Sequence, residues 1–339
     1  MHQSETPKPT FRMVVPTYRR PDRLARFLDC VAPQLARHPE VRLVVVNDGS
    51  HDSAYEAVVA NSPVRFDYLR LADNRGCGPA RQAGFDGATE DYLIATDDDC
   101  RPPPLWLDRI VALAQIHPAV DVFAGRTVPV DRPQGLISRE IKHVPNAVPG
   151  PVMDETMLLT AVTANAVFRR DAFERMGGYA PDLRGAADDC YVTRRIVNGG
   201  GAWMVVPELV TGHEALRSVG EMRHKFRSYG RGSAQYVVRE QDWRVGALHG
   251  EPTLSAGLKQ TVASARAQWG NPENLRAGLF RRAVRAALTF LGVAAYERGW
   301  REGVRAATAQ YGRGLPEAPV LGERYSAFCS EIVLRRRSA

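Results

Sequence analysis

The sequence predicts an α/β protein with a mostly parallel central sheet flanked by helices, followed by a helical extension. Over the first two-thirds of the 339 residues, short β-branched runs alternate with amphipathic stretches. Several runs are apolar throughout, as at 43–46, which suits strands buried on both faces of a parallel sheet. Repeated β-α-β order implies right-handed crossovers and an open sheet. Such a sheet binds its ligands beyond the carboxyl ends of its strands.

The expected elements alternate between strand and helix. Strands are expected at residues 11–15, 41–46, 66–71, 92–96 and 120–125, with helices between them at 23–35, 55–60, 79–88 and 105–116. The next stretch, 126–151, is rich in Pro and Gly and predicts a long loop. Order returns at 158–168, and a helix at 188–198 and a strand at 202–206 follow. The last part is helical, at 221–240, 254–268, 275–297 and 300–310.

Composition excludes several classes of protein. No run approaches the ~18 uncharged apolar residues that a membrane-spanning helix needs. The five cysteines are odd in number and show no CxxC spacing, which disfavours disulfide frameworks and zinc sites and indicates a reducing cytoplasm. Residues 1–215 hold 24 Lys+Arg and 28 Asp+Glu, a balance of −4, whereas 216–339 hold 21 and 10, a balance of +11. The basic part is either a solvated arginine-rich surface or a contact for an anionic partner.

Polar clusters follow the expected strands. The first strand runs into Pro16-Thr17-Tyr18-Arg19, the second into Asp48-Gly49 and the fourth into Asp97-Asp98-Asp99. Three adjacent carboxylates after an apolar strand are costly unless a cation lies among them. Mg²⁺ and Mn²⁺ prefer oxygen ligands and bridge to phosphates. The triplet therefore predicts a divalent-metal site beside a phosphate-bearing ligand.

In this order, and with Asn74, Gly76 and Arg81 after the third strand, the motifs resemble glycosyltransferase family 2 over roughly residues 11–215. The family comprises inverting nucleotide-sugar enzymes with the GT-A fold. The resemblance implies that Asp48 reads the base, Asp97 faces the ribose and Asp99 binds Mn²⁺ or Mg²⁺. It implies a nucleotide-binding set made of Pro16, Thr17, Tyr18, Arg19, Asp48, Gly49, Asn74, Gly76, Arg81, Asp97 and Asp98.

The resemblance continues through the second half of the expected domain. Asn165 matches a strand near the donor sugar, and Gly178 matches a turn that precedes the acceptor side. Asp189, after Asp188, matches the catalytic base that deprotonates the acceptor hydroxyl. The alternative for this acidic pair is the capping of a helix N-terminus. Arg195 matches the arginine that closes this segment, although Tyr191 stands where the family often has an acid.

Two further side chains have two interpretations each. His213 is either a metal or diphosphate ligand or an ordinary structural histidine. Trp106 is either an aromatic wall for a sugar or acceptor ring or a core residue. We expect a catalytic domain over 10–215, with a nucleotide half at about 10–125 and an acceptor half at about 150–215, and a basic helical region over 216–339.

The expected partners are a nucleotide-sugar, with UDP favoured over dTDP and GDP, and a small-molecule or lipid-linked acceptor. Peripheral membrane contact or a homodimer would use the C-terminal helices, and no nucleic acid is expected. One rival is a sugar nucleotidyltransferase, which would show a glycine-rich basic loop after the first strand. A dinucleotide-dependent oxidoreductase would need a glycine fingerprint there, but the near match begins at Gly76, after the third strand. A non-catalytic module that binds nucleotide-sugars or nucleic acid is the last rival.

Overall fold

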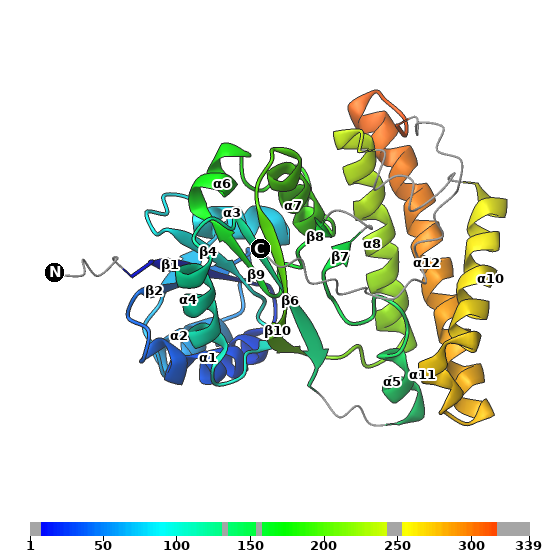
Figure 1. The fold of residues 1–339 in the computed structure, drawn as a ribbon, viewed down its shortest axis with the longest axis horizontal. Helices are drawn as coiled ribbons and strands as arrows, with labels where there is room; N and C mark the ends of the chain where they lie inside the picture. The colour runs from blue at the N-terminus through cyan, green and yellow to red at the C-terminus, as the bar shows by residue number, and fades with distance from the viewer. Residues whose placement is uncertain (1–7, 131–134, 154–157, 243–252, 317–339) are drawn as a thin grey trace. The chain divides into compact units, whose positions relative to one another are not determined.

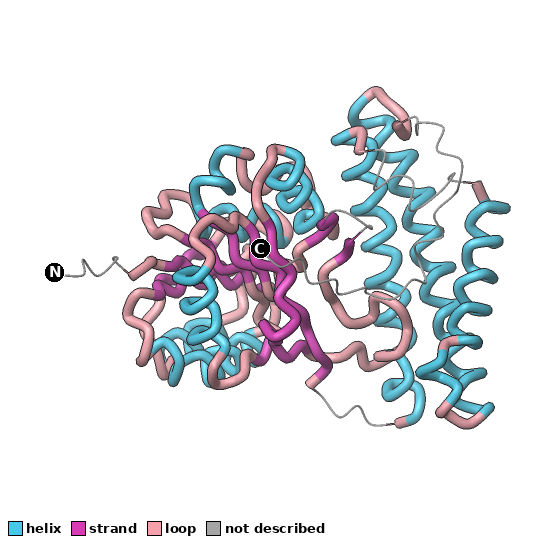
Figure 2. Tube along the Cα trace, in the orientation of Figure 1, coloured by secondary structure: helices cyan, strands magenta, loops and turns pink. Residues whose placement is uncertain are grey.

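The computed structural model describes residues 8–130, 135–153, 158–242 and 253–316. The chain divides into two compact units. The first holds residues 1–128, 149–184 and 189–214, and the second holds residues 129–148, 185–188 and 215–339. Figure 2 shows the strands gathered in the first unit, whereas helices dominate the second.

The first unit contains a mixed eight-stranded sheet in the order β3-β2-β1-β4-β9-β6-β10-β5 (Figure 1). Its strands are β1 Phe11–Thr17, β2 Val41–Asn47, β3 Asp67–Arg70, β4 Tyr92–Ala95, β5 Cys100–Arg101, β6 Val122–Pro129, β9 Ala166–Arg169 and β10 Trp203–His213. The strands β3, β2, β1 and β4 are parallel, as the sequence predicts. Beyond β4 the sheet changes direction, because β9 is antiparallel to both β4 and β6, and β5 is antiparallel to β10. A separate hairpin pairs β7 Val152–Met153 with β8 Leu158–Thr160.

Helices cover both faces of this sheet. They are α1 Pro21–Leu35, α2 Ala54–Ala60, α3 Cys77–Phe85, α4 Trp106–Ile116, α6 Arg170–Arg175 and α7 Asp188–Asn198. Along β1, Met13 packs with α1 and α4 in the main apolar core, whereas Val14 lies against Gly84 of α3. Alternate residues thus face opposite helical layers, which explains why the middle of each strand is apolar on both faces. Apart from Arg12 and Arg42 near their starts, β1 and β2 are polar only at their carboxyl ends.

The second unit contains α5 Leu136–Ile141, α8 Val219–Glu240, α10 Leu254–Gly270, α11 Pro272–Leu275 and α12 Leu279–Tyr311. The two helices expected at 275–297 and 300–310 are one helix, α12. Gly299 lies inside this helix and permits a close approach of α12 to α8. A Cβ at this position would lie 2.1 Å from the carbonyl oxygen of Arg227, so a larger residue would not fit. No helix among the described residues is both long and apolar enough to cross a membrane.

Two stretches differ from expectation. The Pro/Gly-rich stretch 126–151 contains α5, whose Glu140 and Ile141 are buried. The strand expected to end at 206 continues through Pro207 to His213 as β10. Proline is tolerated in a strand where its missing N–H is not needed by a neighbour. The longer strand matters because it brings its last residue to the short strand β5.

Candidate metal and nucleotide site

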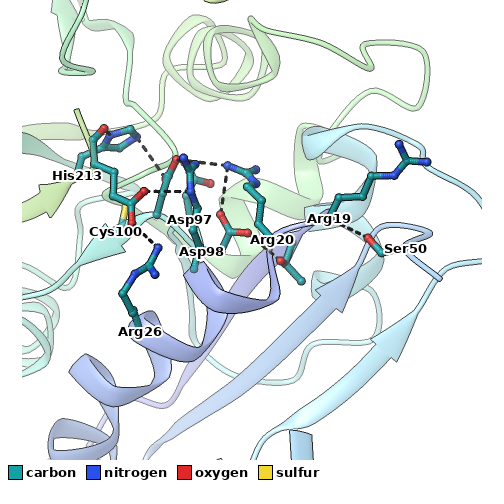
Figure 3. Close-up of polar contacts among 12 residues, drawn as sticks. Arg19, Arg20, Arg26, Ser50, Asp97, Asp98, Cys100 and His213 are labelled. Atoms are coloured by element: carbon teal, nitrogen blue, oxygen red, sulfur yellow. Dashed lines mark hydrogen bonds and ion pairs between the residues drawn. The ribbon is translucent and has the colours of Figure 1, made fainter. Parts of the chain in front are cut away.

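Strand pairing brings His213 to the acidic triplet. In the antiparallel pair of β10 and β5, His213 lies opposite Cys100, which directly follows Asp99. One ligand atom from each of Asp97, Asp99 and His213 lies within 4.8 Å of the others. Figure 3 shows Asp97, Asp98 and His213 side by side at this edge. Three side chains from two segments, which lie more than a hundred residues apart in the sequence, therefore converge on one point.

The hydrogen bonding of His213 leaves the correct nitrogen available for a metal. Its Nδ1 lies 2.8 Å from the carbonyl oxygen of Glu214, and a carbonyl can only accept, so Nδ1–H is the donor. In the neutral ring the lone pair is then on Nε2, which lies 3.4 Å from Oδ1 of Asp99. A metal-binding histidine is commonly oriented by such a bond through its other nitrogen. Two carboxylates and one oriented imidazole suit Mn²⁺ or Mg²⁺.

Arginines lie around the same carboxylates. Arg20 Nη1 lies 3.4 Å from both Asp98 Oδ1 and Asp99 Oδ2, and Arg23 Nη1 lies 3.2 Å from Asp99 Oδ2. Arg81, which is 2% exposed, forms an ion pair with Asp97. Burial raises the pKa of Asp98 to about 7, and Asp99 adds to the rise while Arg20 opposes it. The triplet is therefore compensated by guanidinium groups, which the sequence did not predict.

Glu214 is the residue of this network that the sequence analysis missed. It is 7% exposed, accepts from Arg26 Nη2 at 3.1 Å and from Arg101 Nη2, and forms an ion pair with Arg23 Nε at 3.0 Å. Figure 3 shows Arg26 directed into this cluster from α1. Arg20, Arg23 and Arg26 recur at steps of three, so they share one face at the start of α1. That spacing was the available signal for the network.

The opening turn of the nucleotide motif is tied to the triplet. Thr17, 1% exposed, donates its hydroxyl hydrogen to Asp98 Oδ2 at 2.7 Å and lies 2.9 Å from the Tyr55 hydroxyl. Pro16 is buried at the end of β1. Tyr18 lies under the guanidinium of Arg19, whose backbone N–H donates to Ser50 at 2.8 Å (Figure 3). This contact links the end of β1 to the end of β2, as the sequence predicts for two parallel strands.

Asp48 organises the next loop. Its carboxylate accepts from the backbone N–H of Arg75 at 2.7 Å, from that of Gly76 at 2.9 Å and from Asn74 Nδ2 at 2.9 Å. Gly49 has φ +76°, and a Cβ there would lie 2.4 Å from the backbone of Asp73. Gly76 has φ +92°, and its Cβ would lie 1.9 Å from the carbonyl oxygen of Arg184. Both positions thus require glycine. Asp48 shapes this side of the site in addition to any contact with a base.

Trp106 fits the second of its two interpretations, a core residue, and Asn165 lies in the core beside it. Trp106 has no exposed surface, and its indole N–H donates to Asn165 Oδ1 at 2.9 Å. Asn165, also without exposed surface, donates through Nδ2 to the carbonyl oxygens of Arg126 and Leu209 at 2.9 and 2.8 Å. The amide has used both donor hydrogens and accepts one bond, so neither side chain presents a surface to a sugar. In this structure they join α4, β9, β6 and β10 inside the core.

The remaining residues predicted for the acceptor side lie in α7 or shortly before it. Gly178 has φ +62° and lies against Gln82, so it shapes a turn. Arg195 is exposed and donates to the carbonyl oxygen of Met176 at 2.8 Å. Asp188 is buried and Asp189 is half-buried at the start of α7, where Asp189 Oδ1 accepts from the N–H of Cys190 at 2.8 Å. Asp189 thus accepts from the N–H of the next residue in the first turn of α7, where an acidic side chain is favoured.

Residues 13–177 match the family described as glycosyl transferase family 2. The match covers just under half of the chain. The glycosyltransferase AglE of Haloferax volcanii is 25% identical over 232 residues, which make up 67% of this chain and 74% of the relative. The galactofuranosyltransferase GlfT1 of Mycobacterium tuberculosis is 38% identical over 89 residues, which make up 25% of this chain and 29% of that relative. The family match favours a glycosyltransferase over the nucleotidyltransferase and oxidoreductase alternatives.

A solved structure supports the fold. The mannosyltransferase PcManGT from Pyrobaculum calidifontis, in complex with GDP-Man and Mn²⁺, is similar with a TM-score of 0.56 and 20% identity. The likeness covers 87% of this chain and 88% of that chain. The predicted GT-A fold, an α/β sheet with flanking helices and a helical C-terminal region, is thereby confirmed.

Proposed function

We propose that this glycosyltransferase is an inverting, metal-dependent enzyme that moves a sugar from a nucleotide-sugar to a hydroxyl group of its acceptor. The observation that carries the proposal is the convergence of Asp97, Asp99 and an oriented His213 at the strand edge of a family 2 domain. Asp99 and His213 would hold Mn²⁺ or Mg²⁺. Such an ion, when bound, supplies a Lewis acid for the charge that develops on the diphosphate.

The side chains have separate roles in this proposal. The Thr17–Arg19 turn, Asp48 and the Asn74–Gly76 loop bind the nucleoside, and Asp97 with Arg81 faces its ribose. Asp189 accepts the proton of the acceptor hydroxyl as that oxygen attacks the anomeric carbon from the side opposite the leaving diphosphate. One direct displacement of this kind inverts the anomeric centre. Asp188 positions the start of α7.

The substrates follow from the same resemblance. UDP is the favoured carrier, with dTDP and GDP as alternatives, and the acceptor is a small molecule or a lipid-linked precursor. The proposed setting is the cytoplasm, because the odd number and the spacing of the cysteines in the sequence disfavour a disulfide framework. The proposal includes no nucleic-acid partner.

A thermal-shift panel tests donor binding without knowledge of the acceptor. UDP-, dTDP- and GDP-sugars are each added with Mn²⁺ and with EDTA. A ligand well above its Kd should stabilise the protein by ~2–4 kcal/mol, and we expect this for one carrier only and only with Mn²⁺. Stabilisation of equal size in EDTA would contradict the metal site. No stabilisation by any nucleotide-sugar would contradict the donor assignment as a whole.

A further inference from the structure

The first half of α12 has an unusual distribution of polarity. Leu279 and Phe280 are 70% and 69% exposed, whereas Arg285 and Thr289 are 6% and 0% exposed. A helix on the surface of a soluble protein normally shows the reverse arrangement, with apolar residues inside and charged residues outside. The exposed apolar side continues along the helix, since Phe290 and Leu291 are each 38% exposed. Between them and Phe280 lie the exposed residues Ala283 and Ala287, at helical spacings of three and four residues that place all of them on one side of α12.

The buried polar side has its own partners inside the second unit. Arg285 donates to Glu140 of α5 and to Asn274. Gly292 of α12 lies against Phe226 of α8, where a Cβ would be 3.2 Å from the ring. The unit is therefore packed on this side of α12, and the apolar residues on the opposite side are not needed to close its core.

The turn between α10 and α12 extends the apolar surface. Trp269 is 40% exposed and Leu275 is 58% exposed. The guanidinium of Arg282 lies 4.7 Å from the Trp269 ring centroid and donates to the Trp269 carbonyl oxygen at 2.9 Å, which holds the two helix ends together. We define the apolar face as Trp269, Leu275, Leu279, Phe280, Phe290 and Leu291. A contiguous exposed surface of this kind is a feature of docking sites.

Basic residues are frequent in this part of the chain. Between residues 254 and 292 the sequence has six cations, Lys259, Arg266, Arg276, Arg281, Arg282 and Arg285, and the single acid Glu273. Arg285 is buried against Glu140, so the cations that are at least partly exposed are the other five, of which Arg281 also lies 3.7 Å from Glu140. A second copy of the chain, related by a twofold axis, would bring these same arginines together, and their repulsion would oppose the dimer. Tryptophan, phenylalanine and leucine flanked by arginine instead match the interface of an anionic lipid bilayer, where the apolar groups enter the acyl boundary and the cations meet phosphates.

We infer that the apolar face and its arginines form a docking surface for a membrane that contains anionic phospholipid. The helices lie on the membrane surface and do not cross it. This assignment is independent of the donor and of the chemistry in the first unit. If the acceptor is lipid-linked, docking would also bring the enzyme to its substrate.

Vesicle flotation of the full-length protein tests the inference. Vesicles of phosphatidylcholine alone are compared with vesicles containing about a third phosphatidylglycerol. We expect at least tenfold more protein to float with the anionic vesicles, and raised salt should reduce this fraction because the phosphate contacts are screened. Leu279→Ser with Phe280→Ser should reduce binding at least tenfold. Ile116→Ser is the matched control, since Ile116 is 68% exposed on α4 of the first unit and should not affect binding.

Trp269 provides a second readout. Its emission should shift to the blue with anionic vesicles, and Trp269→Phe should remove that shift while the circular dichroism spectrum stays unchanged. The inference is overturned if neither vesicle binds, or if binding is the same in the Leu279/Phe280 double variant and in wild type. It is also overturned if light scattering shows a dimer that the double variant dissociates, because the apolar face would then be a subunit interface.

Discussion

Arginine is used in opposite ways in the two units. In the first unit Arg20, Arg23 and Arg101 face buried or half-buried carboxylates at the end of the sheet. In the second unit Arg282 lies over the exposed Trp269 ring, and Arg276 directly follows the exposed Leu275 in the sequence. The first set balances charge that would otherwise oppose burial. The second set surrounds apolar area that is exposed to water.

This difference shows that an excess of arginine in a sequence does not by itself reveal what the arginines contact. The +11 balance of residues 216–339 identifies where cations gather. It does not distinguish a guanidinium that pairs inside the unit, as Arg227 does with Glu302, from one that faces outward beside an apolar surface. Only the partners of each side chain make that distinction. The predictions below test the role of charge in each unit.

The largest effect is expected for Asp99→Asn, which keeps the shape of the side chain but removes its charge. Transfer should fall by ~10³-fold or more, because a bound divalent ion contributes several kcal/mol of charge stabilisation at a diphosphate. Calorimetric titration should show that nucleotide-sugar binding no longer depends on Mn²⁺. Asp108→Asn, on the exposed ion pair with Arg37, is the matched control and should behave as wild type. Unchanged Mn²⁺ dependence in Asp99→Asn would mean that Asp99 forms ion pairs with the arginines and does not bind the metal.

Asp189→Asn should leave donor affinity near the wild-type value and lower kcat by ~10²–10⁴-fold, the usual worth of a positioned general base. Asn keeps the oxygen that accepts from Cys190 but cannot take a proton at neutral pH. Asp188→Asn should cost less, because its expected role is positional. A product with retained anomeric configuration by NMR would refute the direct displacement. A larger loss at Asp188 would assign the base to that residue.

Much of the first unit follows from periodicity. The strands β1, β2 and β4 and the helix α7 lie where the sequence predicts them, because each is a continuous apolar or amphipathic run bounded by polar residues. The two-residue strand β5 could not be predicted, since its sequence carries no period. Its pairing with β10 is nevertheless what brings His213 to Asp99.

The site was predictable where it follows strand ends and not where it depends on tertiary partners. Thr17, Asp48 and the triplet were identified from position alone. Trp106 was expected either at a sugar ring or in the core, and the resemblance placed Asn165 near the donor sugar, yet the two side chains bond to each other in the core. Glu214 was missed because a single acid beside a histidine shows no pattern until its three arginine partners are seen.

A smaller effect is expected for Asp48→Asn. The amide cannot accept both the Arg75 and Gly76 N–H bonds with the geometry of the carboxylate, so the loop should shift. The affinities of the free nucleotide and of the nucleotide-sugar should both weaken by ~1–3 kcal/mol, since both ligands share this loop. Asp73→Asn, exposed on the same loop, is the control. If the variant binds the nucleotide normally but has lost transfer, the loop is needed for the transfer step and not for binding of the nucleoside.

The smallest effect concerns stability in the second unit. Burial raises the pKa of Glu297 to about 7, although Arg301 lowers it. Because the folded-state pKa is above the unfolded value of 4.5, the protonated carboxyl favours folding, and this contribution is lost as pH rises from about 4.5 to about 7. Glu297→Gln should therefore be more stable than wild type by ~1–3 kcal/mol at pH 8, and by ~1 kcal/mol or less at pH 5, in urea unfolding.

Glu302 on the same helix is the control of opposite sign. Hydrogen bonds from Arg227 and Arg231 lower the pKa of Glu302 to about 2, against slight desolvation. Its stabilising charge is present above the unfolded value of 4.5 and is lost only as pH falls towards 2. Glu302→Gln should thus destabilise the protein by the same amount at pH 6 and pH 8, whereas the advantage of Glu297→Gln grows over that interval. If both variants show the same pH dependence, the buried carboxyl of Glu297 is not the group that titrates, and the polarity of α12 has another cause.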